Sequence, residues 1–315
     1  MRIFVTGATG VIGRRAVPLL RQAGHEVTAL ARAREKRAVF ERMGVVPVDV
    51  SLFDPSALGR AVMGQDVVIN LATHMPSSPG SLLLPRAWSE NDHIRRQGAA
   101  NLVEAALSGG VRHFVQESFA PAYPDRGDDW IDEGVPLEPS RYNRTILDAE
   151  RSAEQFSRGA RSGVVLRFAA FYGPDARLLT DMVRWVERGW APMPGSARAF
   201  VSSISHDDAA TAVVTALGLP AGCYNVADDE PVSHRDYVDA LAAALSVPSP
   251  KLPPAWATFL FGSVGRMLAR SLRISNRKLR DCSEWRPRYS TVREGWPAFA
   301  PAYARAAAPV VGPQR

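Results

Sequence analysis

Three glycines near the amino terminus constrain the fold more than any other feature of the sequence. The β-prone run at residues 3–6 leads directly into Gly7, and Gly10 and Gly13 follow at intervals of three as a helical pattern begins. In such a turn the first glycine permits a tight bend, the second lets the backbone approach a pyrophosphate, and the third lets the helix pack close to the strand. Because the helix N-terminus then faces the phosphates, the pattern predicts a dinucleotide site.

Short β-prone runs and helical patterns alternate through the first half of the chain. This alternation is typical of parallel strands joined by right-handed crossovers. We expect strands at 3–6, 26–31, 45–48, 67–71, 113–116 and 164–168, and helices at 11–22, 34–42, 55–62, 87–107 and 142–156. Together they predict an α/β fold of Rossmann type, a doubly wound parallel sheet whose ligand lies beyond the carboxyl ends of the strands.

The alternation stops after residue 171, where turns rich in glycine and proline begin. We therefore expect a dinucleotide-binding domain over 1–171, with a return to the sheet at about 201–227. A smaller, discontinuous substrate-binding lobe is expected over 172–200 and 228–305, with helices at 236–245 and 256–271. Residues 306–315, rich in alanine and proline, are expected to form a loosely ordered tail.

The charged residues and cysteines exclude several classes of partner. The net charge is +6, but basic residues are spread along the chain, and no zinc-finger, basic-zipper or RNA-binding-strand signature occurs. We therefore expect a small-molecule substrate and no nucleic acid, while a homodimer stays open. The two cysteines, Cys223 and Cys282, lack metal-ligand spacing, so no metal site is expected. Their scarcity favours a reducing, cytoplasmic location.

The most apolar segment lies at residues 254–272. Arg266 and Arg270 interrupt it, and it is too short and too charged to span a bilayer. We expect it to pack in the core or to cover the substrate, and the alternative is a helix that lies on a membrane surface. The amino terminus opens on a β-prone run rather than on a signal-peptide pattern.

The end of the second expected strand bears on the choice of cofactor. Sites of this fold that prefer NAD place an acidic residue there, which accepts hydrogen bonds from the ribose, but this chain has Ala31. Arg32 follows at once, and a guanidinium suits a 2′-phosphate. Further basic residues surround this position: Arg14, Arg34, Lys36 and Arg37. The cluster favours NADP over NAD, with a solvated basic helix face as the alternative.

Several motifs occur in an order that resembles the extended short-chain dehydrogenase/reductases, the group of the NAD-dependent epimerase/dehydratase type. They are the glycine turn, Asp49-Val50, Asn70-Leu71-Ala72-Thr73, Phe171-Tyr172-Gly173-Pro174, Gly222-Cys223-Tyr224-Asn225-Val226 and Trp285-Arg286-Pro287. The resemblance implies NAD(P)-dependent chemistry, an adenine flanked by Asp49 and Val50, and a cofactor lined by the residues after the fourth strand. The expected cofactor contacts are Gly7, Thr9, Gly10, Val11, Ile12, Gly13, Arg32, Asp49, Val50, Leu71, Ala72, Thr73 and Tyr142.

Members of that family use a serine or threonine after the fifth strand, a tyrosine, and a lysine four residues beyond the tyrosine. Tyr142 fits the tyrosine, and the nearest serine is Ser118, with Glu117 and Phe119 as alternatives for its place. Ile146 stands in the place of the lysine, and isoleucine can neither donate a hydrogen bond nor carry a charge. The chain has no lysine between residues 37 and 250. The cations that remain to reach the site are Arg95, Arg96 and Arg167.

Three functions are compatible with these residues. The first is NADPH-dependent reduction of a carbonyl or an activated double bond, with neutral Tyr142 as the proton donor. The second is a nucleotide-sugar epimerase or dehydratase, which begins by oxidising the sugar and therefore needs the missing base. The third is a non-catalytic NADP-binding sensor or scaffold, which needs only the glycine turn and Arg32.

Overall fold

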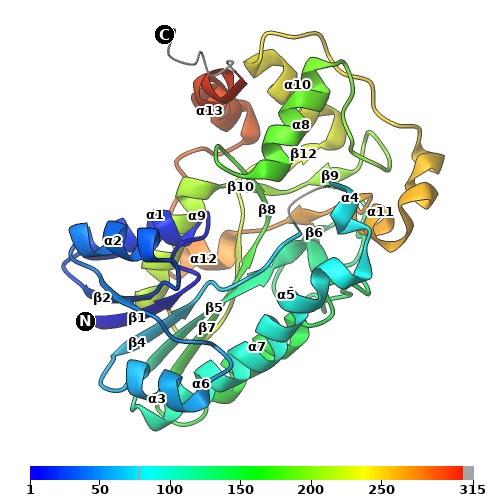
Figure 1. Cartoon of the computed structure of the whole chain (residues 1–315). Helices are drawn as coiled ribbons and strands as arrows, with labels where there is room; N and C mark the ends of the chain where they lie inside the picture. The colour runs from blue at the N-terminus through cyan, green and yellow to red at the C-terminus, as the bar shows by residue number, and fades with distance from the viewer. Residues whose placement is uncertain (77–78, 308–315) are drawn as a thin grey trace, which may run out of the picture.

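A seven-stranded parallel sheet forms the centre of the molecule (Figure 1). The computed structural model describes residues 1–76 and 79–307, so positions 308–315 of the expected tail lie outside the described residues. The strand order is β11-β7-β5-β4-β1-β2-β3, and every neighbouring pair is parallel. The strands are β1 (Arg2–Thr6), β2 (Glu26–Leu30), β3 (Val46–Val48), β4 (Val67–Asn70), β5 (His113–Phe119), β7 (Ser162–Phe168) and β11 (Gly222–Val226). The expected doubly wound α/β fold is confirmed, and the seventh strand, β11, comes from the segment expected to return to the sheet.

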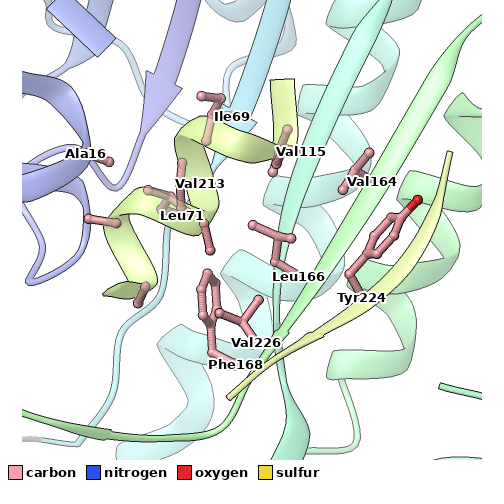
Figure 2. Packing of buried hydrophobic residues seen from close by; sticks show 14 of the residues in the cluster. Ala16, Ile69, Leu71, Val115, Val164, Leu166, Phe168, Val213, Tyr224 and Val226 are labelled. Carbon is pink, nitrogen blue, oxygen red and sulfur yellow. The ribbon is translucent and has the colours of Figure 1, made fainter. Parts of the chain in front are cut away.

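Helices cover both faces of this sheet because its strands are apolar on both sides. Along β1, Ile3 and Val5 pack on one face while Phe4 packs on the other. One face carries α1 (Gly13–Gln22), α2 (Arg34–Arg42) and α9 (His206–Thr215), and the other carries α3 (Pro55–Val62), α6 (Ala99–Ser108) and α7 (Ile146–Phe156). Figure 2 shows the first of these interfaces, where Val213 of α9 lies beside Leu71 above the strands.

Two expected helices differ from the observed ones. The helix expected at 87–107 is divided into η1 (Pro85–Trp88), α5 (Ser89–His93), the π-helical turn η2 (Ile94–Gly98) and α6. The helix expected at 142–156 begins only at Ile146, after a turn over 141–145. In that turn the Asn143 side-chain oxygen Oδ1 accepts from the Ser140 hydroxyl, and the Thr145 hydroxyl donates to Asp92. The first bond is local and competes with helix formation, whereas the second is a tertiary contact.

The segment expected to return to the sheet at 201–227 does so only in part. Its last strand, β11, pairs with β7 in the large sheet. Before it, β9 (Phe200–Val201) and β10 (Ser203–Ser205) belong to separate two-stranded sheets, with β12 (Val232–Ser233) and β8 (Ala170–Tyr172) respectively. The residues between β10 and β11 form α9 and the 3-10 turn η4 (Ala216–Gly218), so most of this segment is helical.

The smaller lobe lies beyond the carboxyl ends of β5 and β7 (Figure 1). A second core there includes Val186, Leu241 and Trp296. These residues come from α8 (Arg177–Glu187), α10 (His234–Ala244) and α13 (Val292–Ala307). The connecting elements are α4 (Pro79–Leu82), η3 (Ala120–Ala122), β6 (Trp130–Ile131), η5 (Ala255–Phe261), α11 (Gly262–Leu268), β13 (Arg273–Ile274) and α12 (Arg277–Asp281).

Candidate cofactor and active site

The glycine turn between β1 and α1 has the geometry of a cradle for a ligand. Gly7 has a φ of +67°, and a Cβ added to it would lie 2.2 Å from the carbonyl oxygen of Leu71. A Cβ on Gly13 would lie 2.3 Å from the Gly7 carbonyl oxygen. These two positions require glycine because the protein itself fills the space. Gly10 differs, since among the described residues its Cβ would meet only the Gly7 oxygen, at 3.2 Å.

The open side of Gly10 fits an approaching dinucleotide. The exposed backbone at Gly10 continues into Val11 and Ile12, whose amides have no hydrogen-bond partner among the described residues. No side chain caps the N-terminus of α1 either. Free amides at the positive end of a helix bind phosphate oxygens, so the residues present fit the pyrophosphate of a nicotinamide dinucleotide.

Two alanine variants are expected to separate the role of the fold from the role of the ligand. Gly13→Ala should lower the free energy of unfolding by about 1–3 kcal/mol, because its Cβ collides with backbone atoms. Gly10→Ala should melt close to the parent but bind the dinucleotide more weakly. Thermal melts without ligand and calorimetric titrations with it provide the two measurements. A Gly10→Ala variant that binds like the parent would contradict the cradle.

A hydrogen-bonded ladder fixes the strand ends beneath this turn. Thr6 donates to Asn70 Oδ1 at 2.6 Å, and Asn70 donates to Gln116 Oε1 at 2.9 Å. The same Asn70 oxygen accepts from the Ala72 amide at 3.3 Å, which orients the segment Leu71 to Thr73. Sequence reasoning missed Thr6 and Gln116 as supports of the site. Their shared role follows from the strand register, which no local pattern reveals.

Ion pairs divide the basic cluster beside the turn. Arg14 pairs with Asp175 at 3.0 Å, and Arg37 pairs with Asp49 at 3.2 Å. These ion pairs offset the charge of two of the five basic residues in the cluster. Three cations have no ion-pair partner among the described residues: Arg32, Arg34 and Lys36. The ammonium of Lys36 lies 3.5 Å from Thr9 Oγ1. Ala31, just before them, is buried at the end of β2.

Ser118 does not have the position expected of a catalytic serine. It is fully buried, and its hydroxyl donates to Glu150 of α7. Among the described residues no contact joins Ser118 to Tyr142. The physical reason is the alternation of β5, which directs residue 118 towards α7 rather than towards the crevice. In this structure the Ser118 hydroxyl is therefore engaged by Glu150 and does not face Tyr142, contrary to the assignment from the sequence.

Glu150 and Arg167 form the centre of the buried network that includes Ser118. Arg167 donates to both carboxylate oxygens of Glu150, at 2.9 and 2.7 Å, and to the Tyr123 hydroxyl at 2.7 Å. Tyr123 in turn donates to Asn225 of β11 at 2.9 Å. Burial opposes the charge of Arg167, but the hydrogen bonds and the charge of Glu150 raise its pKa overall. The network ties β5, β7, β11 and α7 together.

Tyr142 lies in the turn before α7, and its side chain is half-buried. Its ring lies 6.0 Å from that of Trp88, and its hydroxyl makes only a long hydrogen bond, 3.5 Å, to the Leu83 carbonyl. Ile146, at the first position of α7, is fully buried. Because Tyr142 precedes the helix, the two residues do not share a helix face as their spacing of four predicted.

The three candidate substitutes for the missing lysine have different surroundings. Arg96 is exposed and pairs with Asp148, while Arg167 is held by Glu150. Arg95 is 3% exposed on the π-helical turn η2 and pairs with Glu117, near the end of β5, at 3.2 Å. Its Nε has no partner among the described residues. Short π-helical turns occur often at functional sites.

Other titratable side chains offer little chemistry near neutral pH. Burial, with the positive charge of Arg15, lowers the pKa of His206 to about 4, so this imidazole is neutral. Burial raises the pKa of Cys223 to about 12.

Within 1–76 and 79–307, no group of three or more histidine, cysteine or acidic side chains is arranged to hold a metal ion. In the same ranges no helix has the length and apolar character needed to cross a membrane.

Comparison with known proteins assigns the family. Residues 3–227 match the model described as the NAD dependent epimerase/dehydratase family. The chain belongs to this family. A 3-diazoavenalumate denitrifying reductase from a Streptomyces species is 32% identical over 306 residues, which cover 94% of this epimerase-family chain and 99% of the relative.

More distant members of the family agree over most of the chain. A 2-alkyl-3-oxoalkanoate reductase of Shewanella oneidensis is 27% identical over 87% of the chain and 73% of the relative. The crystal structure of human epimerase family protein SDR39U1 (isoform 2) with NADPH superposes with a TM-score of 0.79 at 19% identity, covering 96% of this chain and 99% of that one. At that identity the likeness establishes the shared Rossmann-type fold.

Proposed function

We propose that this protein is an NADPH-dependent reductase that uses Tyr142 as its proton donor. The proposal depends chiefly on one observation: the place of the family's lysine holds the fully buried Ile146, so no ammonium assists the phenol. A tyrosine without such help keeps its proton near pH 7 and serves as an acid rather than a base. That asymmetry favours reduction over oxidation.

The chain's residues divide the work of such a reaction. A bound NADPH would supply a hydride. The free amides at Val11 and Ile12 would hold its pyrophosphate, and Arg32 would meet its 2′-phosphate. Hydride addition leaves negative charge on the carbonyl oxygen or on the second atom of the activated double bond. Tyr142 gives its hydroxyl proton to that atom. The Leu83 carbonyl orients the phenol only weakly, at 3.5 Å, which leaves the hydroxyl free to meet a substrate.

The names of relatives support this direction. Two curated relatives that match most of the chain are named reductases, one of a diazo compound and one of a 3-oxoalkanoate. Epimerases and dehydratases of the family begin with oxidation of the substrate. That step needs tyrosinate, which the family's lysine favours, and Ile146 stands in the place of this lysine. The substrate class proposed here is therefore a small metabolite with a carbonyl or an activated double bond.

Turnover decides between the reductase and a non-catalytic NADP-binding protein. The experiment follows NADPH absorbance with a panel of 3-oxo acids, enones and aryl diazo compounds, beside a binding titration. A reductase consumes NADPH with at least one member of the panel. Tight binding of NADPH with no oxidation across the panel would support the sensor or scaffold instead.

Cofactor choice provides a separate prediction. Arg32→Ala is expected to weaken NADPH binding by about 1–3 kcal/mol, the value of a charge-assisted hydrogen bond, and to leave NADH nearly unchanged. Arg42→Ala is a matched control, since Arg42 is also exposed and unpaired among the described residues but lies at the other end of α2. Equal affinities of the parent for the two cofactors would contradict the NADP assignment.

A further inference from the structure

The 3-10 helix η5 exposes its largest side chains. Trp256, Phe259 and Leu260 are 65%, 75% and 73% exposed, whereas the smaller Ala257 and Thr258 are 7% and 9% exposed. In a 3-10 helix residues i and i+3 lie on the same side, so Trp256 and Phe259 share one side of η5, and Leu260 follows Phe259 directly. This is the reverse of a segment that packs in a core, and a cluster of exposed large apolar residues marks an interaction site.

A second exposed apolar segment is linked to η5 indirectly, through the Tyr142 turn and α11, which packs on η5. Leu83 and Leu84, after α4, are 37% and 58% exposed, and the Leu83 carbonyl accepts from Tyr142. On the other side, Asn143 donates to the sulfur of Met267 in α11 at 3.3 Å. Figure 1 shows α4 and α11 on the same side of the molecule. We call Leu83, Leu84, Trp256, Phe259 and Leu260 the apolar collar.

Exposed arginines occur on the elements next to the collar residues. Arg86 follows Leu84 on η1, Arg141 and Arg144 belong to the Tyr142 turn, and Arg266 lies on α11. None of these four has an ion-pair partner among the described residues. A surface that combines exposed tryptophan, phenylalanine and leucine with unpaired guanidinium groups suits the boundary between lipid headgroups and acyl chains.

We propose that the apolar collar docks on an anionic phospholipid bilayer. The large side chains enter the headgroup region, and the four arginines meet lipid phosphates, each cation contributing through attraction to the negative surface. A second copy of the chain fits less well, because a two-fold interface would bring both sets of arginines face to face. Docking places the turn that carries Tyr142 near the membrane surface. The proposal does not depend on the proposed catalytic activity.

Sedimentation with vesicles tests the proposal. The full-length protein is mixed with vesicles of phosphatidylcholine alone or of phosphatidylcholine with phosphatidylglycerol. The parent is expected to pellet with the anionic vesicles and to be released by salt. The triple variant Trp256→Ser/Phe259→Ser/Leu260→Ser should partition at least ~10-fold less, since it removes the buried apolar area. Arg141→Gln/Arg144→Gln should lower partition by about five-fold per charge.

A control of similar exposure isolates the collar. Met63 and Val46 are 66% and 59% exposed, and Met63 follows α3 at the opposite end of the molecule from α11 (Figure 1). Met63→Ser/Val46→Ser should bind vesicles like the parent, and all variants should melt alike. Failure of the parent to pellet with anionic vesicles would overturn the proposal. So would unchanged binding by the triple variant, or a parent dimer in light scattering that the triple variant abolishes.

Discussion

Replacing Glu150 with leucine is expected to lower the free energy of unfolding by about 3–5 kcal/mol, because it leaves a buried guanidinium without its counterion. Glu150 and Arg167 are 6% and 9% exposed, so water cannot take over the lost hydrogen bonds. Ser118 loses its acceptor in the same step. Unfolding in urea, followed by fluorescence, measures the change.

Two further variants show that the effect comes from burial of the pair. Asp148→Asn lies on the same helix, but its partners Arg96 and Arg151 are largely exposed. It should cost about 0–1 kcal/mol, as surface pairs do. The double variant Glu150→Leu/Arg167→Met removes both charges and should be more stable than Glu150→Leu alone. A single variant as stable as Asp148→Asn would show that the network carries little of the stability.

Tyr142→Phe is expected to slow NADPH-dependent reduction by about 10²- to 10⁴-fold, the usual contribution of a positioned general acid. Binding of the cofactor should stay close to that of the parent, because the glycine turn is untouched. The half-buried phenol makes only one long hydrogen bond, so its loss should leave the melting temperature nearly unchanged. Steady-state rates and a binding titration on the same preparation give both results.

Tyr289→Phe serves as the matched control for that variant. Tyr289 is a partly exposed tyrosine in the second core, where its ring packs on Phe299. Its variant should turn over substrate at the parent's rate. A folded Tyr142→Phe protein that binds NADPH and reduces a confirmed substrate as fast as the parent would place the proton donor elsewhere.

The sequence predicted the sheet better than the site. Helices α2 and α3 have the predicted bounds, and the strands differ by a few residues at most, because their apolar runs and flanking turns are local signals. The division of the helix at η2 could not be predicted from local patterns, because residues distant in sequence bond to the helices on either side of it. Asn91 accepts from the His74 amide, and Asn101 donates to the Leu52 carbonyl.

The candidate catalytic residues show the same limit of local patterns. The pattern of the family placed Ser118 near Tyr142, but the strand alternation directs this serine to Glu150, which lies 32 positions later in the chain. The pattern also placed Tyr142 and Ile146 on one helix. Contacts from Ser140 and Asp92 hold residues 143 and 145 in a turn instead, and the contact with Asp92 depends on the tertiary fold.

The pairing of β11 with β7 has a consequence for the order of folding. The β7 edge of the large sheet stays open until Gly222–Val226 is synthesised, which happens after the residues of α8, β10 and α9. Until that moment β7 presents unpaired backbone groups, and Tyr123 lacks its partner Asn225. An open parallel edge of this kind is slow to close and prone to pairing with other chains. On the ribosome, this edge is therefore the point at which a nascent chain most needs protection from its neighbours.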